Sequence, residues 1–238
     1  ALAGVRDALH DRLDRAAHFD ERREALEAEV AACLETYRSA ALDLSRRRAR
    51  HAKALAGQVE KLMQQLGMGG GAFLIEVKHD PDAPPTGLGS DRVDMKVSAN
   101  PGMKPAPLAR VASGGELSRI SLALKVATAD SGARTQVFDE IDTGVGGDTA
   151  NAVGQLLQTV SQGGQALCVT HLAQVAVRAD QQLQVSKQAA RRTTSVDTRV
   201  LDGAERVEEI ARMLGGTVSD QSRAHAREML ESAGSTLQ

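Results

Sequence analysis

The first 66 residues carry apolar side chains at intervals of three and four. The series is close to the heptad seam of a coiled coil, and it lapses to polar residues at three places. Its members are Leu26, Val30, Cys33, Tyr37, Ala40, Leu44, Arg47, His51, Leu55, Gln58, Leu62 and Leu66. This spacing predicts one long helix over about 21–66. At about 1.5 Å per residue it would be on the order of 70 Å long, too long to lie across a domain of this size, so we expect an arm.

A shorter helix is expected before the long one, with a separation at residues 18–20. The chain opens inside this helical pattern without a start signal, and we therefore expect it to be a fragment of a longer protein. Composition changes sharply near Gly67, because all six prolines and 20 of the 22 glycines follow Leu66. The sequence thus predicts an arm over residues 1–66 and a separate lobe over residues 67–238.

The pattern of the second part is that of an α/β fold. Strand-like runs at 73–78 and 92–98 flank a Pro/Gly turn and predict an antiparallel pair. Apolar strands then alternate with helices, which is typical of a largely parallel, covered sheet. The expected elements are helix 116–129, a strand ending at Phe138, helix 148–160, strand 165–169, strands 182–186 and 196–201, and helices 205–214 and 219–232.

Charge and composition narrow the classes of function. The net charge is −2, and no window approaches the roughly 18 to 20 apolar residues of a membrane helix, nor does a signal peptide open the chain. A cytoplasmic protein without membrane contact is predicted. Cys33 and Cys168 stand apart from any metal-binding spacing, so neither a disulfide framework nor a zinc site is expected. With no Trp, one Tyr and three Phe, a stacking platform for single-stranded nucleic acid is disfavoured.

A basic run at residues 46–53 lies on the predicted long helix. It could follow a phosphate backbone, but a charge run on a helix is usually a solvated face. Both interpretations stay open from the sequence.

The first candidate site is Ser113-Gly114-Gly115-Glu116, which opens a helix. Ser113 and Glu116 have the spacing of a capping box, which is a purely structural role. The same geometry presents free backbone N–H groups and the positive end of the helix dipole, which suits a phosphate.

The second and third candidates follow apolar strands. Asp139, Glu140 and Asp142 come directly after the strand that ends at Phe138, and His171 follows the next strand. Isolated acids at a strand end are often only a solvated turn, and a lone His is more often structural. The carboxyl edge of a parallel sheet, however, is where α/β proteins bind ligands. An acid pair there could place Asp139 on magnesium and Glu140 as a general base toward water.

Taken together, these motifs resemble the C-terminal half of an ABC-type ATPase head of the SMC class, and within it the RecN family of bacterial DNA repair proteins. The matching segments are 111–119, 138–144 with Gly146 and Gly147, 168–175 and 213–216. The resemblance covers about residue 67 to the end, while the coil matches only in character. It implies an α/β lobe of a P-loop ATPase head with an N-terminal antiparallel coiled-coil arm.

The resemblance also implies a role for each candidate residue. Ser113, Gly114, Gly115 and Glu116 correspond to the signature motif, which contacts the γ-phosphate of ATP held by the opposite head. Asp139 corresponds to the Walker B residue that holds Mg²⁺ through water, and Glu140 to the general base. Asp142 corresponds to the D-loop residue that communicates across the dimer, and His171 to the switch histidine. The implied partners are the N-terminal head lobe, a second copy through ATP-bound heads, and DNA, in a nucleoid-associated cytoplasmic protein.

One element of that family is missing from the sequence. No G-x-x-x-x-G-K-S/T loop is present, and Gly102-Met103-Lys104 lacks the required spacing. Without a loop that cradles the β-phosphate, this chain is expected to be inactive alone. The alternatives are a structural module whose coil mediates assembly, or the half-head of an SbcC-like or SMC protein. A coil that turns back at residues 18–20 would favour RecN, and one that continues would favour the others.

Overall fold

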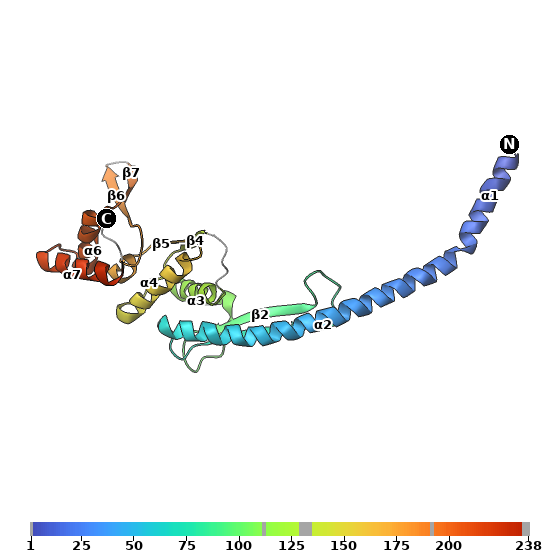
Figure 1. Ribbon diagram of the computed structural model, residues 1–238, viewed down its shortest axis with the longest axis horizontal. Coiled ribbons are helices and arrows are strands. Elements are labelled where there is room, and N and C mark those ends of the chain that lie inside the picture. The colour runs from blue at the N-terminus through green and yellow to red at the C-terminus, as the bar shows by residue number, and fades with distance from the viewer. Residues whose placement is uncertain (1, 111–112, 129–134, 191–192, 235–238) are drawn as a thin grey trace. The chain divides into compact units, whose positions relative to one another are not determined.

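The computed structural model describes residues 2–110, 113–128, 135–190 and 193–234. They form two compact units, which we treat separately (Figure 1). The first unit comprises residues 1–52 and 76–94, and the second comprises residues 53–75 and 95–238. Val111 and Ala112, which begin the first matching segment, lie outside the described residues.

Two helices, α1 (Leu2–Ala17) and α2 (Phe19–Gln65), confirm the expected pair (Figure 1). The joint at His18 keeps helical hydrogen bonds on both sides: the His18 amide donates to Asp14, and the Arg22 amide donates to His18. The helix therefore bends at this joint without turning back, and the joint offers no support for RecN over its longer-coiled relatives.

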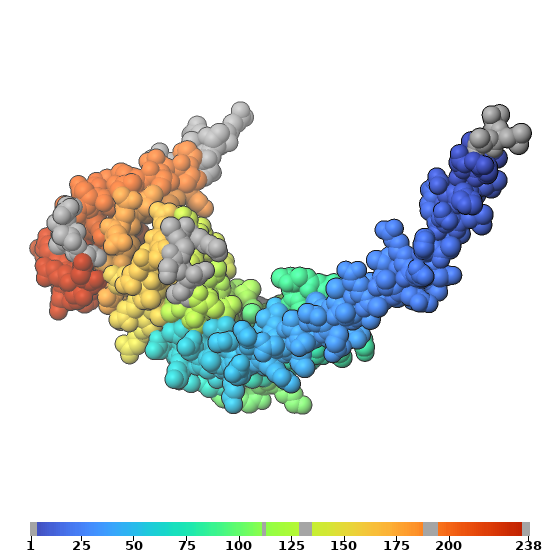
Figure 2. All heavy atoms as spheres, turned by 45° about the vertical axis from the view of Figure 1, so that its right-hand side comes forward, coloured from blue at the N-terminus to red at the C-terminus, as the bar shows by residue number. Residues whose placement is uncertain are grey.

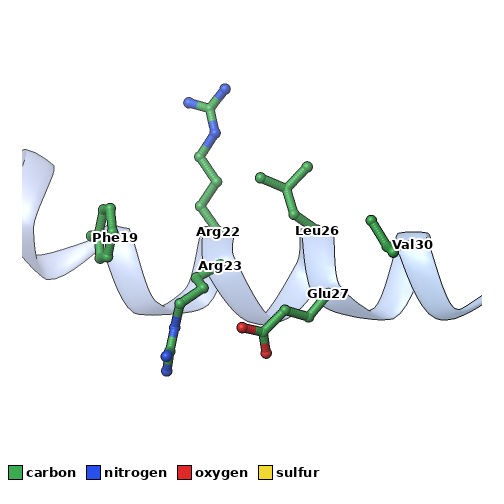
Figure 3. A pocket seen from close by; sticks show the side chains of 6 residues that line it. All are labelled: Phe19, Arg22, Arg23, Leu26, Glu27 and Val30. Atoms are coloured by element: carbon green, nitrogen blue, oxygen red, sulfur yellow. The ribbon is translucent and has the colours of Figure 1, made fainter.

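The N-terminal part of α2 presents an apolar stripe to solvent. Phe19, Leu26 and Val30 are all more than half exposed and line a shallow hollow, with Arg22, Arg23 and Glu27 beside them (Figure 3). In Figure 2 no other segment covers the visible face of this blue part of α2. Within the described part of the first unit, no second helix covers the stripe. The second helix of the expected antiparallel coiled coil is therefore not among these residues.

Farther along α2, the buried face only partly follows the predicted seam: Leu66 is fully buried and Leu55 and Leu62 pack against the core, as predicted. The predicted positions Arg47, His51 and Gln58 are exposed, and the buried or half-buried stripe lies one residue later. Its members are Ala41, Ser45, Arg48, Ala52, Ala56, Val59 and Met63. Several of these side chains are small, and a small side chain permits close approach without adding much hydrophobicity. The polar lapses therefore lie at a solvent-facing edge of the helix.

A buried carboxylate ties the two stretches of the first unit together. Asp91, at the start of β2 (Asp91–Ser98), has no exposed side-chain surface. Its carboxylate accepts from Arg48 Nη1 at 3.0 Å and lies 3.2 Å from Nδ1 of His79, the last residue of β1 (Ala72–His79). Burial would raise the pKa of Asp91, but hydrogen bonds from Arg48, Ser45 and His79 outweigh it and hold the pKa below its ordinary value.

This clamp predicts acid-induced opening of the loop between β1 and β2. Because the pKa of Asp91 is lowered by folding, its stabilisation is complete above about pH 4 and is lost as the pH falls through the lowered pKa. Tyr37 reports on the loop, since its hydroxyl lies 3.1 Å from Ser90 Oγ and accepts from the Thr86 amide at 3.1 Å. With one Tyr and no Trp in the chain, intrinsic fluorescence isolates this contact.

We expect a change in Tyr37 emission below about pH 4 in the native chain. The Asp91→Asn variant should show the acid-form emission already at neutral pH, whereas Asp82→Asn, in the exposed loop, should titrate like the native chain. An unchanged acid transition in Asp91→Asn would assign the effect to another group.

The second unit has its larger core around the end of α2. Val59, Met63, Leu66 and Phe73 have no exposed surface and pack in one cluster with residues of α3 (Gly114–Ala127), β4 (Thr135–Phe138) and α4 (Gly147–Ser161). β1, β2 and the short β3 (Ala106–Pro107) are neighbours in that order, and β2 and β3 are antiparallel. A 3₁₀ turn, η1 (Leu108–Arg110), follows β3.

The parallel strands predicted in the lobe are present as one pair. β4 and β5 (Gln165–Cys168) run parallel, with Val137 opposite Leu167 and Phe138 opposite Cys168. Figure 1 shows α3 and α4 close to this pair. Among the described residues the sheet has only these two strands, and Val137, Leu167 and Val169 are 69%, 44% and 65% exposed. The expected covered sheet is therefore incomplete on this chain.

A second cluster closes the chain. It packs α5 (Ala173–Ala176), α6 (Gly203–Gly215) and α7 (Asp220–Ser232) around Ile210 and Leu230, which have no exposed surface. The two strands expected before it are present as β6 (Leu183–Ala190) and β7 (Thr193–Val200), and they pair antiparallel. None of the helices in the described residues is long and apolar enough to cross a membrane.

Candidate functional site

The parallel pair brings two predicted site segments to one sheet edge. β4 ends at Phe138, directly before Asp139 and Glu140, and β5 ends at Cys168, three residues before His171. The Val169 amide donates to the Phe138 carbonyl at 3.1 Å, which extends the pairing beyond the strands. Because parallel strands end at a common edge, the loops that follow them are neighbours. This juxtaposition was expected from the strand order alone.

Glu140 has a backbone conformation that side-chain-bearing residues rarely adopt. Its φ is +56°, and it is the only non-glycine residue with positive φ in the described part of the chain. Its amide donates to Asp139 Oδ1 at 2.9 Å, so the first carboxylate holds the backbone of the second in place. Both residues are exposed. Left-handed backbone costs on the order of 1–3 kcal/mol and is concentrated at functional sites, because local contacts must over-determine it.

The start of α3 lies against this acid pair. Ser113 is the N-cap and its Oγ accepts from the Glu116 amide at 3.4 Å, which supplies one of the two bonds of the predicted capping box. A Cβ atom at Gly114 would lie 2.8 Å from Glu140 Oε2, and one at Gly115 would lie 3.2 Å from the Thr143 carbonyl. The two glycines therefore leave room for Glu140 and its loop to approach the helix start.

Two further residues hold α3 to the acid loop, and the sequence analysis did not single them out. Ser118 Oγ donates to the Asp139 carbonyl at 3.0 Å, and Arg119 Nη1 donates to the Thr143 carbonyl at 2.9 Å. Arg119 is buried, which lowers its pKa, while the charge of Glu116 acts in the opposite direction. Both residues stand at the end of the Ser-Gly-Gly-Glu-Leu-Ser-Arg string, so their presence inside the motif was the available signal.

Asp142 differs from the other site residues because its side chain points inward. It is only 3% exposed, and its Oδ2 accepts from Thr170 Oγ1 at 2.5 Å and from the His171 amide at 2.9 Å. Burial raises the pKa of neighbouring Cys168 to about 12, and the charges of Asp142 and Asp139 act in the same direction. That thiol is therefore protonated and a poor nucleophile at neutral pH.

The donor set fits a magnesium ion only in part. No cluster of three or more His, Cys, Asp or Glu side chains suited to a metal occurs among the residues that the structure describes. Mg²⁺ typically binds through one or two carboxylates together with waters and substrate phosphates. The exposed Asp139 carboxylate suits that share of the coordination, whereas Asp142 is already occupied by hydrogen bonds within the chain.

Comparison with known proteins finds similar sequences among DNA repair proteins. No family model matches it. The DNA repair protein RecN of Xylella fastidiosa (strain 9a5c) is 40% identical over 232 residues, which cover 97% of this chain and 42% of that protein. RecN of Vibrio cholerae is 43% identical over 216 residues, which cover 90% of this chain and 39% of that protein. This chain is therefore RecN-like in sequence.

A third relative shares the name RecN at lower identity. RecN of Halalkalibacterium halodurans is 36% identical over 245 residues, which cover 99% of this chain and 42% of that protein. The chain thus spans about two fifths of the length of these RecN proteins. Because the alignment covers nearly the whole chain, the arm is similar to RecN in its sequence and not only in its coiled-coil pattern.

Solved structures agree on the fold. The Smc head domain with a coiled coil and joint from Pyrococcus yayanosii has a TM-score of 0.51 at 19% identity, covering 92% of this chain and 37% of that one. The Smc head domain with an extended coiled coil bound to the C-terminal domain of ScpA, derived from Pyrococcus furiosus, has a TM-score of 0.50 at 18% identity, covering 78% and 44%. The expected fold class, an SMC-type head portion with a helical arm, is confirmed.

Proposed function

We propose that this chain supplies the C-terminal lobe of an ATPase head in a RecN-like protein of DNA double-strand-break repair. The observation that carries the proposal is the convergence of three segments: the acid pair after β4, the loop after β5, and the glycine-lined start of α3. The RecN relatives support the assignment to repair, because their printed name is that of a DNA repair protein.

Each segment would serve one part of ATP hydrolysis. Glu140 would act as general base toward the attacking water, and His171 would contact the γ-phosphate. Ser113, Gly114, Gly115 and Glu116 would bind the γ-phosphate of a nucleotide held by a second head. Asp139 would hold Mg²⁺ through water, and the ion would neutralise charge on the phosphates.

The exposed face of the β4–β5 pair supports an additional partner segment. Parallel strands are almost always covered on both faces, yet Val137, Leu167 and Val169 are exposed here. The sequence also lacks a phosphate-cradling loop, and the RecN relatives are more than twice as long as the matched segment. An N-terminal head lobe of the same protein would supply both the loop and the cover.

The remaining partners are a second copy, joined through ATP-bound heads, and DNA. The basic run on α2 is one candidate for phosphate contact, although Arg47 pairs with Asp43 at 2.8 Å and Arg48 pairs with Asp91 at 3.0 Å. Arg46 and Arg50 are exposed on the same stretch. A cytoplasmic, nucleoid-associated location follows from this function.

Steady-state hydrolysis tests the proposal. ATP turnover would be measured for this chain alone, for a separately produced N-terminal head lobe, and for their mixture. We expect activity only in the mixture. If the two pieces associate, as judged by size-exclusion chromatography, and still release no phosphate, the chain is better described as a structural module whose coil mediates assembly.

The role of α3 in pairing of heads predicts a specific defect. Ser113→Arg in the assembled head should abolish ATP-dependent dimerisation measured by light scattering, because a long cationic side chain would fill the space intended for phosphate. Loss of an N-cap by itself costs about 0.5–2 kcal/mol. Ser219→Arg removes the N-cap of α7 in the same way and serves as the matched control.

Normal ATP-dependent pairing of Ser113→Arg heads would contradict the assignment of α3 to the shared nucleotide site. Equal defects in Ser113→Arg and Ser219→Arg would instead indicate a general loss of stability.

A further inference from the structure

One carboxylate oxygen organises the loop that carries His171. Oδ2 of Asp142 accepts hydrogen bonds from Thr170 Oγ1 at 2.5 Å and from the His171 amide at 2.9 Å. It also lies 3.2 Å from His171 Nδ1. All three groups belong to the same chain and to two consecutive residues. Asp142 therefore makes these contacts within its own chain, whereas the family resemblance assigns this residue to communication across a dimer.

Asp142 is itself held firmly. Its neighbour Ile141 has no exposed surface and belongs to the larger core, and the carbonyl of Thr143 accepts from buried Arg119. Asp142 is thus fixed on both sides along the backbone. A carboxylate oxygen makes stronger hydrogen bonds than a neutral acceptor does.

The loop that receives these bonds is also fixed at its far end. Thr170 Oγ1 accepts from the Leu172 amide at 3.0 Å, and Leu172 is the N-cap of α5. His171 stands between these anchors with its side chain 71% exposed. Its backbone is therefore constrained while its imidazole remains accessible to a ligand.

We propose that Asp142 is a positioning residue for His171 within its own chain. The carboxylate holds the His171 backbone and favours the neutral tautomer that carries hydrogen on Nδ1. Nε2 is then the ring atom presented to solvent and, if the ATPase proposal holds, to the nucleotide. The physical basis is electrostatic: a carboxylate oxygen 3.2 Å from Nδ1 favours a proton on that nitrogen, which leaves Nε2 as the acceptor.

The tautomer can be measured without any nucleotide. Long-range ¹H–¹⁵N correlation spectra of the ¹⁵N-histidine-labelled 238-residue chain distinguish protonated from unprotonated ring nitrogens. The His171→Gln variant assigns the signal among the six histidines. At a pH where His171 is neutral, we expect the native chain to show the Nδ1–H form.

Asp142→Asn should shift the ratio of the Nδ1–H to the Nε2–H form by on the order of tenfold, because a charged acceptor is replaced by a neutral amide. Asp148→Asn, an exposed acid in the first turn of α4, should leave the ratio unchanged. Thr170→Val removes one donor but keeps the carboxylate, so it should retain the Nδ1–H form even if Asp142→Asn perturbs the fold.

An Nε2–H tautomer in the native chain, or the same ratio in the native chain and Asp142→Asn, would overturn the proposal. The outcome is independent of hydrolysis. If Asp142→Asn shifts the tautomer but the reconstituted head is inactive, Asp142 is still a positioning residue for His171, and the ATPase proposal is wrong. An active head with an unchanged tautomer would leave the ATPase assignment intact and refute this inference.

Discussion

Replacing Glu140 with glutamine is expected to lower ATP turnover of the reconstituted head by about 10²- to 10⁴-fold, the usual contribution of general acid–base catalysis. The substitution keeps the shape of the side chain and removes only its ability to accept a proton. ATP binding should persist, because Ser113, Gly114 and Gly115 do not depend on that proton. Phosphate release and equilibrium nucleotide binding are the two measurements.

The conformation of Glu140 makes this prediction stronger than an acid at a strand end would allow. A positive φ of 56° at a side-chain-bearing residue is unfavourable, and contacts on two sides maintain it here. Asp139 Oδ1 accepts from the Glu140 amide, and the Glu140 carboxylate lies 2.8 Å from where the Cβ of a side chain at Gly114 would be. A merely solvated turn would not require this arrangement.

Glu231→Gln, at an exposed position of α7, is the matched control and should leave turnover unchanged. Near-normal hydrolysis by Glu140→Gln would exclude Glu140 as the base. Loss of both binding and hydrolysis would point to a folding defect instead.

The second large effect concerns stability. Phe73→Ala should destabilise the second unit by about 3–5 kcal/mol, the usual cost of deleting a buried aromatic side chain. Phe73 has no exposed surface and packs in the cluster that joins the end of α2 to α3 and β4, and its amide donates to Glu60 Oε1 at 2.9 Å. With slopes of about 1–3 kcal/mol/M in urea, the midpoint should fall by about 1–5 M.

Cys168 supplies the readout, because it lies half-buried in the same cluster while Cys33 is exposed. Pulsed thiol labelling across a urea series reports when Cys168 loses protection, and Cys33 calibrates the reagent. Phe19→Ala removes the same side chain from a 65%-exposed position on α2, so its midpoint should match that of the native chain. Equal midpoints for Phe73→Ala and Phe19→Ala would show that Phe73 is not part of the stabilising core.

The order of elements was accessible from the sequence because each depends on local pattern. Apolar runs ending at Phe138 and Cys168, with a helix between them, predicted two parallel strands that share an edge, and the structure has them. The same logic placed Asp139, Glu140 and His171 at neighbouring strand ends. The roles of these residues in hydrolysis remain predictions.

The buried face of α2 was not accessible in the same way. The three-and-four spacing selected Ala40, Leu44, His51 and Leu55, but the most buried positions lie one residue later, where Ala41, Ser45 and Ala56 allow close approach. Small residues contribute little to a hydrophobic pattern, and their burial depends on what lies opposite. That information is held by segments far away in the chain.

The sequence by itself determined the helices, the strand order and the motif residues of this protein, because periodicity, glycines and strand-end acids act over a few positions. Only the tertiary structure decided how those residues are used. It turned Asp142 inward onto Thr170 and His171, held Glu140 in a left-handed conformation against Gly114, and recruited Arg119 to the acid loop. These contacts join residues about 24 to 29 positions apart, and the orientation of a side chain across such a separation is determined by packing, which a linear pattern does not encode.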